Sequence, residues 1–194
     1  MLRALLMATA LSLPAAAQRV TEPGSGLSVD PPAGYAAALA EARPPNAAAI
    51  SLRRPEDTDT GCQIVFRPQR ENAAFSQSVI NQAVLGLTWG EEAARNLSAV
   101  YDIQQQDSFR HAGVEVIVLE GMVRMVPGVP ERGREIRTIF FIFETPRGRT
   151  SVICVGEVGD FAVRRAEFVS VARAIDPPAL LITPGPPPPR AVKP

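Results

Sequence analysis

The chain has 194 residues, 46% of them hydrophobic, and its 20 basic and 20 acidic side chains give a net charge of zero. This length and apolar content are sufficient for one packed domain. The neutral balance disfavours a nucleic-acid-binding protein, which needs a basic surface, and a protein held on an anionic membrane by its charge.

The first 17 residues predict a cleaved secretory signal peptide. Arg3 precedes an apolar run over residues 4–13, and the segment ends in three alanines at 15–17. A basic start, an apolar core of about ten residues and a small-residue exit are typical of such a leader, and a membrane span needs roughly 20 apolar residues. We expect cleavage after Ala17, where no cysteine is available for a lipid anchor; the alternative is a buried N-terminal helix. The mature protein is therefore expected in the periplasm or outside the cell, without a transmembrane anchor.

Residues 18–176 are predicted to form a single globular domain that begins with three short strands. Residues 26–30 alternate in polarity, as a half-buried strand does. Residues 47–52 and 63–66 are the next two strand-like runs, each bounded by prolines or polar residues.

Two helices are predicted to follow. Five apolar residues at helical spacing form the stripe of the first, which we expect to face the core: Phe75, Val79, Ala83, Val84 and Leu87. Thr88 stands three residues before Glu91, the spacing of a capping box, so the second helix is expected to begin there. Its expected core-facing stripe is Trp89, Ala93, Leu97 and Val100.

The second half of the domain predicts a strand meander and a closing helix. Residues 103–110 and 114–126 are expected to pair around a tight turn, and residues 136–144 and 150–155 form a second hairpin. Three stretches of these strands are nearly continuously apolar and need cover on both faces: residues 116–119, 139–143 and 152–155. One cover is the helix pair. The other is a helix predicted from Asp160 to Asp176, whose stripe is Phe161, Phe168, Val169, Ala172 and Ile175.

The predicted fold class is therefore α+β, a mostly antiparallel sheet sandwiched between a helix pair and a C-terminal helix. Residues 177–194 contain eight prolines and are expected to form an extended, disordered tail. The alternative for this tail is a PxxP-type ligand or a spacer through the envelope.

The order of these elements resembles a known fold family. The segment Gly-Leu-Ser-Val-Asp-Pro-Pro-Ala-Gly-Tyr at 26–35, a helical segment, a long antiparallel meander and a closing amphipathic helix resemble the PsbP-like fold, which bacterial DcrB-like envelope proteins also resemble. The resemblance covers most of residues 24–175 in element order. It implies an assembly, accessory or binding role rather than catalysis, and it transfers no functional residue.

Cys62 and Cys154 are the only cysteines of the chain. In an exported protein an even number of cysteines favours a disulfide, and a crosslink that closes a loop of about 100 residues stabilises by about 4.7 kcal/mol in the chain-entropy model. A redox-active pair is disfavoured because no Cys-x-x-Cys motif is present. We predict a structural disulfide between Cys62 and Cys154, with two free buried thiols as the alternative.

The sequence predicts no catalytic, cofactor-binding or metal-binding residue. His111, the only histidine, could act as a general base, but its place beside a hairpin turn favours an exposed turn residue. One histidine and two paired cysteines leave too few ligands for zinc. The acidic run at 56–59 lacks the glycine and glutamate of an EF-hand loop and is expected to be a solvated loop. Glu115 and Glu120 are expected on opposite faces of one strand, too far apart for a paired-carboxylate site.

These observations favour a non-enzymatic binding, assembly or accessory protein of the bacterial envelope whose partner is another envelope protein. Arginine makes up nearly all of the basic residues, and alanine and proline are abundant, as in the proteins of GC-rich bacteria. The alternative is a secreted hydrolase or small-ligand-binding protein in which His111 and a nearby acid or serine converge. A toxin-immunity or effector role is a third hypothesis.

Overall fold

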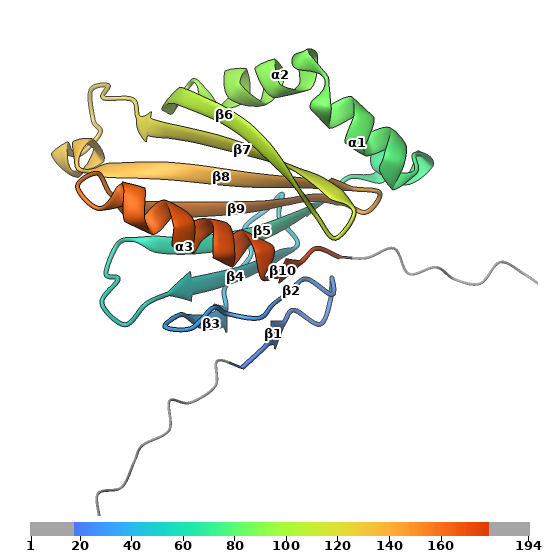
Figure 1. The fold of residues 1–194 in the computed structure, drawn as a ribbon, viewed down its shortest axis with the longest axis horizontal. Helices are drawn as coiled ribbons and strands as arrows, with labels where there is room; N and C mark the ends of the chain where they lie inside the picture. Colours follow the sequence, from blue (N-terminus) through green and yellow to red (C-terminus); the bar gives the residue numbers. More distant parts are fainter. Residues whose placement is uncertain (1–17, 179–194) are drawn as a thin grey trace, which may run out of the picture.

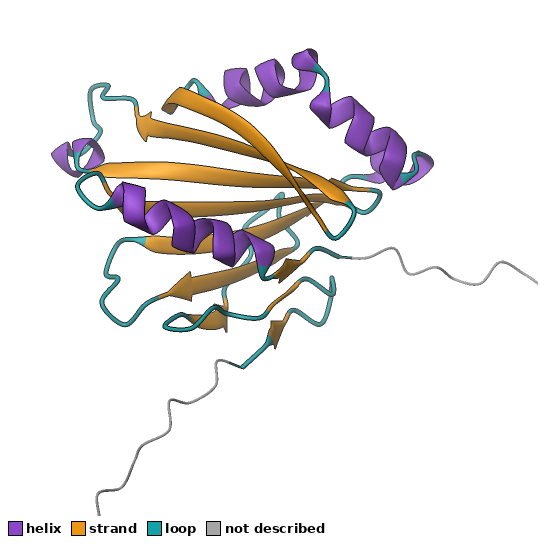
Figure 2. Ribbon diagram, in the orientation of Figure 1, coloured by secondary structure: helices purple, strands orange, loops and turns teal. Residues whose placement is uncertain are grey.

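Four strands from the second half of the chain form the middle and one edge of a large antiparallel sheet. The computed structural model describes residues 18–178, and Figures 1 and 2 show the sheet with helices on both faces. Its seven strands run in the order β3-β4-β5-β9-β8-β7-β6, and every neighbouring pair is antiparallel. The strands are β3 (Ala36–Leu39), β4 (Ala48–Arg53), β5 (Gly61–Pro68), β6 (Tyr101–His111), β7 (Val114–Val123), β8 (Ile136–Thr145) and β9 (Gly148–Glu157).

A second, three-stranded sheet has the order β1-β2-β10. Its strands are β1 (Val20–Thr21), β2 (Ser28–Val29) and β10 (Ile175–Asp176). The helices are α1 (Gln77–Leu85), α2 (Leu87–Leu97) and α3 (Phe161–Arg173), with two 3-10 helices, η1 (Arg70–Ala74) and η2 (Glu131–Arg134).

Successive side chains of the central strands point to opposite faces of the sheet and build two apolar cores. On β8, Ile139, Phe141 and Phe143 pack toward α3. Phe140 and Ile142 of the same strand pack toward α1 and α2. The predicted α+β sandwich, with a helix pair on one face and a C-terminal helix on the other, is confirmed.

The strand boundaries differ from the sequence expectations mainly at the N-terminal end. The expected strand at 26–30 is reduced to β2, and β7 ends at Val123 rather than at residue 126. The sequence did not predict β3, because its run Ala36-Ala37-Ala38-Leu39 shows no alternation of apolar and polar residues.

Of the predicted stripe of the first helix only Val84 is buried, and the prediction is wrong for the other four residues. The buried residues of α1 are Ile80, Asn81 and Val84, whereas Phe75 and Val79 are 52% and 47% exposed. A polar side chain accounts for this difference. Asn81 faces the sheet, where its Nδ2 donates to the Gly113 carbonyl (2.7 Å) and its Oδ1 accepts from the Glu115 amide (3.0 Å). These bonds satisfy two backbone groups at the start of β7 and hold Asn81, rather than Val79, against the sheet.

The capping box is also absent. Ser76 caps α1, since its Oγ accepts from the Val79 amide, but α2 begins at Leu87 after Gly86 with no side-chain cap. Thr88 therefore lies inside α2 rather than before it. Only Gly86 separates the two helices, and this single residue is at once the last cap of one and the first cap of the other.

The C-terminal helix is shorter than expected and buries a charge. It ends at Arg173, and Ile175 lies instead in β10, where it pairs with Val29 of β2. Arg164 belongs to its buried face, and its Nη1 lies 2.9 Å from Oδ1 of Asp57. The helix ends early because the next residues pair with β2 in an extended conformation.

Cys62 and Cys154 lie directly opposite each other on β5 and β9 and form a disulfide. Both side chains belong to the core beneath α3. The bond joins the fifth strand to the ninth across a sequence separation of 92 residues, as expected. Within residues 18–178, no helix has the length and apolar character needed to cross a membrane.

Candidate functional site

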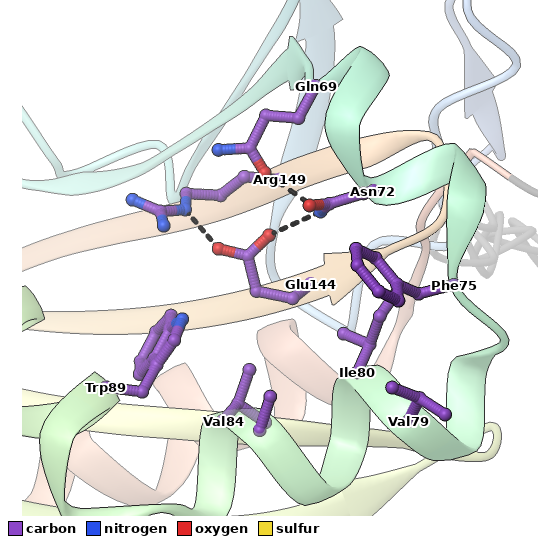
Figure 3. Close-up of a pocket in the computed structure, with 10 residues that line it drawn as sticks. Gln69, Asn72, Phe75, Val79, Ile80, Val84, Trp89, Glu144 and Arg149 are labelled. Atoms are coloured by element: carbon purple, nitrogen blue, oxygen red, sulfur yellow. Dashed lines mark hydrogen bonds and ion pairs between the residues drawn. The ribbon is translucent and has the colours of Figure 1, made fainter.

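A pocket of about 260 Å³ lies between α1, the start of α2 and the ends of β8 and β9 (Figure 3). Its walls are mostly apolar, and a small polar group lies at one end. The lining residues are Gln69, Asn72, Phe75, Val79, Ile80, Ala83, Val84, Trp89, Glu144 and Arg149.

The orientation of α1 about its axis, which differs from the predicted one, shapes the apolar part of this pocket. Ile80 and Val84 pack on the sheet, while Phe75 and Val79 stand at the rim with about half of each side chain exposed. Trp89 of α2 lies on the other side of the opening, as Figure 3 shows. Phe75 leaves η1 in an extended conformation, which places its ring beside the first turn of α1.

The polar end of the pocket is organised by Glu144, whose side chain is only 5% exposed. Its Oε1 accepts from Nε of Arg149 (2.5 Å) and its Oε2 from Nδ2 of Asn72 (3.2 Å). The Asn72 amide also donates to Oε1 of Gln69 (3.0 Å) and to the Thr145 carbonyl (3.1 Å). Both oxygens of this carboxylate therefore have hydrogen-bond partners, as a buried carboxylate requires.

Arg149 links the polar end to the aromatic wall. Its guanidinium lies 5.6 Å from the centre of the Trp89 ring, a cation–π contact. The side chain is 31% exposed, so the group is open to the pocket mouth. A flat cation on an aromatic face, beside an apolar wall, can bind a molecule with a polar head and an apolar body.

His111 is not an exposed turn residue. It is the last residue of β6 and is half-buried, with Nε2 3.2 Å from the Ile175 carbonyl and its ring edge-on to Phe143. Neither neighbour is a nucleophile or an acid, and His111 does not line the pocket. Its contacts join β6 to β10 and give no support to a hydrolase.

The acidic run at 56–59 is not simply a solvated loop, because Asp57 is buried with a side chain 2% exposed. Burial opposes ionisation, but hydrogen bonds from Arg164, the Arg54 amide and Thr60 outweigh it and lower the pKa of Asp57 below its ordinary value. Tyr35 belongs to the same cluster: burial, with a hydrogen bond to Glu167, raises its pKa to about 12. This cluster fastens the β4–β5 loop to α3.

Glu115 and Glu120 lie apart, on the two faces of β7. Glu115 pairs with Arg110 on the same hairpin (3.5 Å), and Glu120 pairs with Arg165 of α3. They form no paired-carboxylate site. Among residues 18–178, no group of three or more histidine, cysteine or acidic side chains has the arrangement of a metal site.

Sequence reasoning missed the Glu144–Arg149 pair. One signal was available: a glutamate at the end of the apolar run of β8, five residues before an arginine across a tight hairpin. Residues directly opposite in a hairpin share a face and form pairs, and Glu144 and Arg149 are such partners. Asn72 and the exposed ring of Phe75 gave no comparable signal.

Comparison with known proteins identifies the fold of this chain. Neither a protein-family model nor a curated protein matches the chain. Among solved structures, the solution structure of cyanobacterial PsbP (CyanoP) from Synechocystis sp. PCC 6803 matches with a TM-score of 0.55, over 89% of this chain and 98% of that chain. The fold is PsbP-like. The predicted resemblance is therefore confirmed for the fold, while a sequence identity of 11% carries over no residue or activity.

Proposed function

We propose that this protein is an exported accessory protein of the bacterial envelope, and that the α1–α2 face with its pocket binds another envelope component. The proposal concerns binding rather than catalysis. Three lines of support are the exposed apolar residues around the pocket, the features of an exported chain and the fold neighbour.

The carrying observation is the exposed apolar surface at the rim of the pocket, formed by Phe75 and Val79, and beside it, formed by Leu85 and Leu87. Large apolar side chains along η1, α1 and the start of α2 are exposed by 47–85%: Phe75, Val79, Leu85 and Leu87. Exposed apolar surface beside a concave pocket is the usual mark of an interaction site. The polar base of the pocket is internally bonded, so a binding partner meets an ordered surface.

Export is supported by the leader pattern at residues 1–17, which lies outside the described residues, and by the disulfide between Cys62 and Cys154. Disulfides persist in the periplasm and outside the cell and are rare in a reducing cytosol. The PsbP-like neighbour supports an accessory role by analogy of fold alone.

Crosslinking in living cells tests the proposal. A photo-reactive amino acid at Val79 on α1 is expected to capture a defined envelope component, identified by mass spectrometry. The matched control is Val163 on α3, an apolar residue that is also exposed, by 70%. Capture at Val79 should disappear when Leu87 is replaced by Glu, and the same crosslinker at Val163 should capture nothing comparable. Equal products at both positions, or none at either, would refute the α1–α2 face as the binding surface.

A further inference from the structure

Beside the polar end of the pocket lies a second basic side chain, Arg67, which is not one of the lining residues. Arg67 of β5, Arg149 of β9 and Glu144 of β8 lie directly opposite one another across three adjacent strands. Directly opposite residues share a face of the sheet, and two like charges in this position repel. One carboxylate therefore stands against two guanidinium groups, and the row as a whole has a positive charge.

Most of the unused polar groups of this end are donors, and the exception is Oδ1 of Asn72. Both oxygens of Glu144 and Oε1 of Gln69 already accept hydrogen bonds. Within residues 18–178, the Nη atoms of Arg149, the Nε2 of Gln69 and the exposed guanidinium of Arg67 donate no hydrogen bond. A ligand that complements them must present acceptors, and an anion satisfies guanidinium donors best.

The other end of the pocket is mostly hydrocarbon, with the indole N–H of Trp89 as its one side-chain polar group. Its walls are the side chains of Phe75, Val79, Ile80, Val84 and Trp89, and the backbone groups in the interior of α1 and α2 are engaged in their own helices. A peptide threaded here would bury N–H and C=O groups without partners, which is unfavourable. An alkyl chain has no such groups and is stabilised in proportion to its buried area.

We infer that the pocket binds a fatty carboxylate, a single alkyl chain with an anionic head. The carboxylate lies against Arg149 beside Gln69, and the chain lies between Phe75 and Trp89, all four of which Figure 3 labels. This inference rests on the proposed function, since it names the ligand of the same binding face.

Trp89 provides a direct measurement because it is the only tryptophan and lines the pocket. Purified protein is titrated with decanoate, and with decanol, decyltrimethylammonium and acetate as comparison ligands. We expect a saturable change in tryptophan fluorescence with decanoate, at least tenfold tighter binding than for decanol or the cation, and no saturation by acetate. Equal affinities for the three decyl compounds, or no saturation by decanoate, would overturn the inference.

Variants then separate the head-group contact from folding. Arg149→Gln should weaken decanoate binding at least tenfold and abolish the preference over decanol, with affinity measured by calorimetry because the substitution also alters the surroundings of Trp89. The double variant Glu144→Gln with Arg149→Gln removes both charges and avoids an unpaired buried carboxylate, and it should lose the preference too. Arg95→Gln, an exposed arginine on α2, is the matched control and should bind as the wild type. Unchanged preference in both folded variants would contradict the assigned head-group site.

The two proposals fail in different ways. Loss of crosslinking at Val79 with intact decanoate binding would overturn the envelope partner and leave the ligand. Intact crosslinking without decanoate binding would overturn the ligand alone. Tighter binding of a short acetylated leucine peptide with a free carboxyl end than of decanoate would likewise overturn the fatty carboxylate as ligand.

Discussion

The two faces of the large sheet are covered by helices to very different extents. On one face, α3 buries Phe161 and Phe168, and Ile175 of the adjoining strand β10 is buried with them; each of the three is exposed by 3% or less. On the other, α1 and α2 bury Ile80 and Val84 but leave much apolar surface at the pocket rim. The α3 face is organised for stability, and the α1–α2 face keeps apolar surface that stability alone would bury.

Charged groups follow the same division. Beneath α3, Arg164 and Asp57 are almost fully buried and bonded to each other. On the α1–α2 face, Arg149 pairs with Glu144, has Arg67 as its cross-strand neighbour and remains partly exposed. The first arrangement fixes a loop to a helix, whereas the second leaves donors for a ligand.

The largest contrast is expected from matched phenylalanine truncations. Phe168→Ala should lower the free energy of unfolding by about 4 kcal/mol, because a fully buried ring leaves a cavity in the core. Phe75→Ala should change it by about 0.5 kcal/mol, because half of its ring is already in water. Urea unfolding followed by circular dichroism measures both. Similar losses for the two variants would mean that the two faces do not differ in this way.

The disulfide belongs to the stable face, and its removal is expected to have the next largest effect. Replacing Cys62 and Cys154 together by alanine should lower the free energy of unfolding by about 3 kcal/mol, chiefly by releasing the unfolded chain from a long closed loop. Thermal unfolding with and without a reducing agent provides the control: the reductant should destabilise the wild type and leave the double variant unchanged. A wild type insensitive to a reductant that demonstrably cleaves its disulfide would speak against this assignment.

Asp57→Asn tests the buried ion pair and should lower the free energy of unfolding by about 2 kcal/mol at neutral pH, since a charged hydrogen bond to Arg164 is lost. The folded protein lowers the pKa of Asp57, so this contribution is fully present above the ordinary value of 3.8 and is lost as the pH falls through the lower folded value. The stability difference between wild type and variant should therefore be constant near neutrality and shrink only in acid. Glu56→Gln, an exposed neighbour in the same loop, serves as control. A difference that grows on acidification would contradict the lowered pKa.

How far the sequence predicts this molecule depends on whether apolar or polar contacts decide a feature. The strands β7, β8 and β9 and the sandwich follow from continuous apolar runs that need cover on both faces. The pairing of Cys62 with Cys154 is predicted from their even number and from the export that the leader pattern predicts. The orientation of α1 about its axis could not be predicted, because it depends on hydrogen bonds from the side chain of Asn81 to backbone groups more than 30 positions away. The shape of the pocket depends on that orientation, so the candidate site could not be predicted either.

The smallest expected change in the free energy of unfolding, apart from that of Phe75→Ala, tests the hydrogen bonds that orient α1. Asn81→Ala removes the acceptor of the Glu115 amide and the donor to the Gly113 carbonyl, and should lower the free energy of unfolding by about 1 kcal/mol. Hydrogen exchange measures the local consequence: the Glu115 amide should lose protection, while amides of β8 and β9 beneath α3 keep theirs. Gln82→Ala, on the exposed side of the same helix, is the matched control and should leave the Glu115 amide protected. If the Asn81 variant retained full protection at Glu115, side-chain amides would not hold α1 in place, and the exposed ring of Phe75 would need another cause.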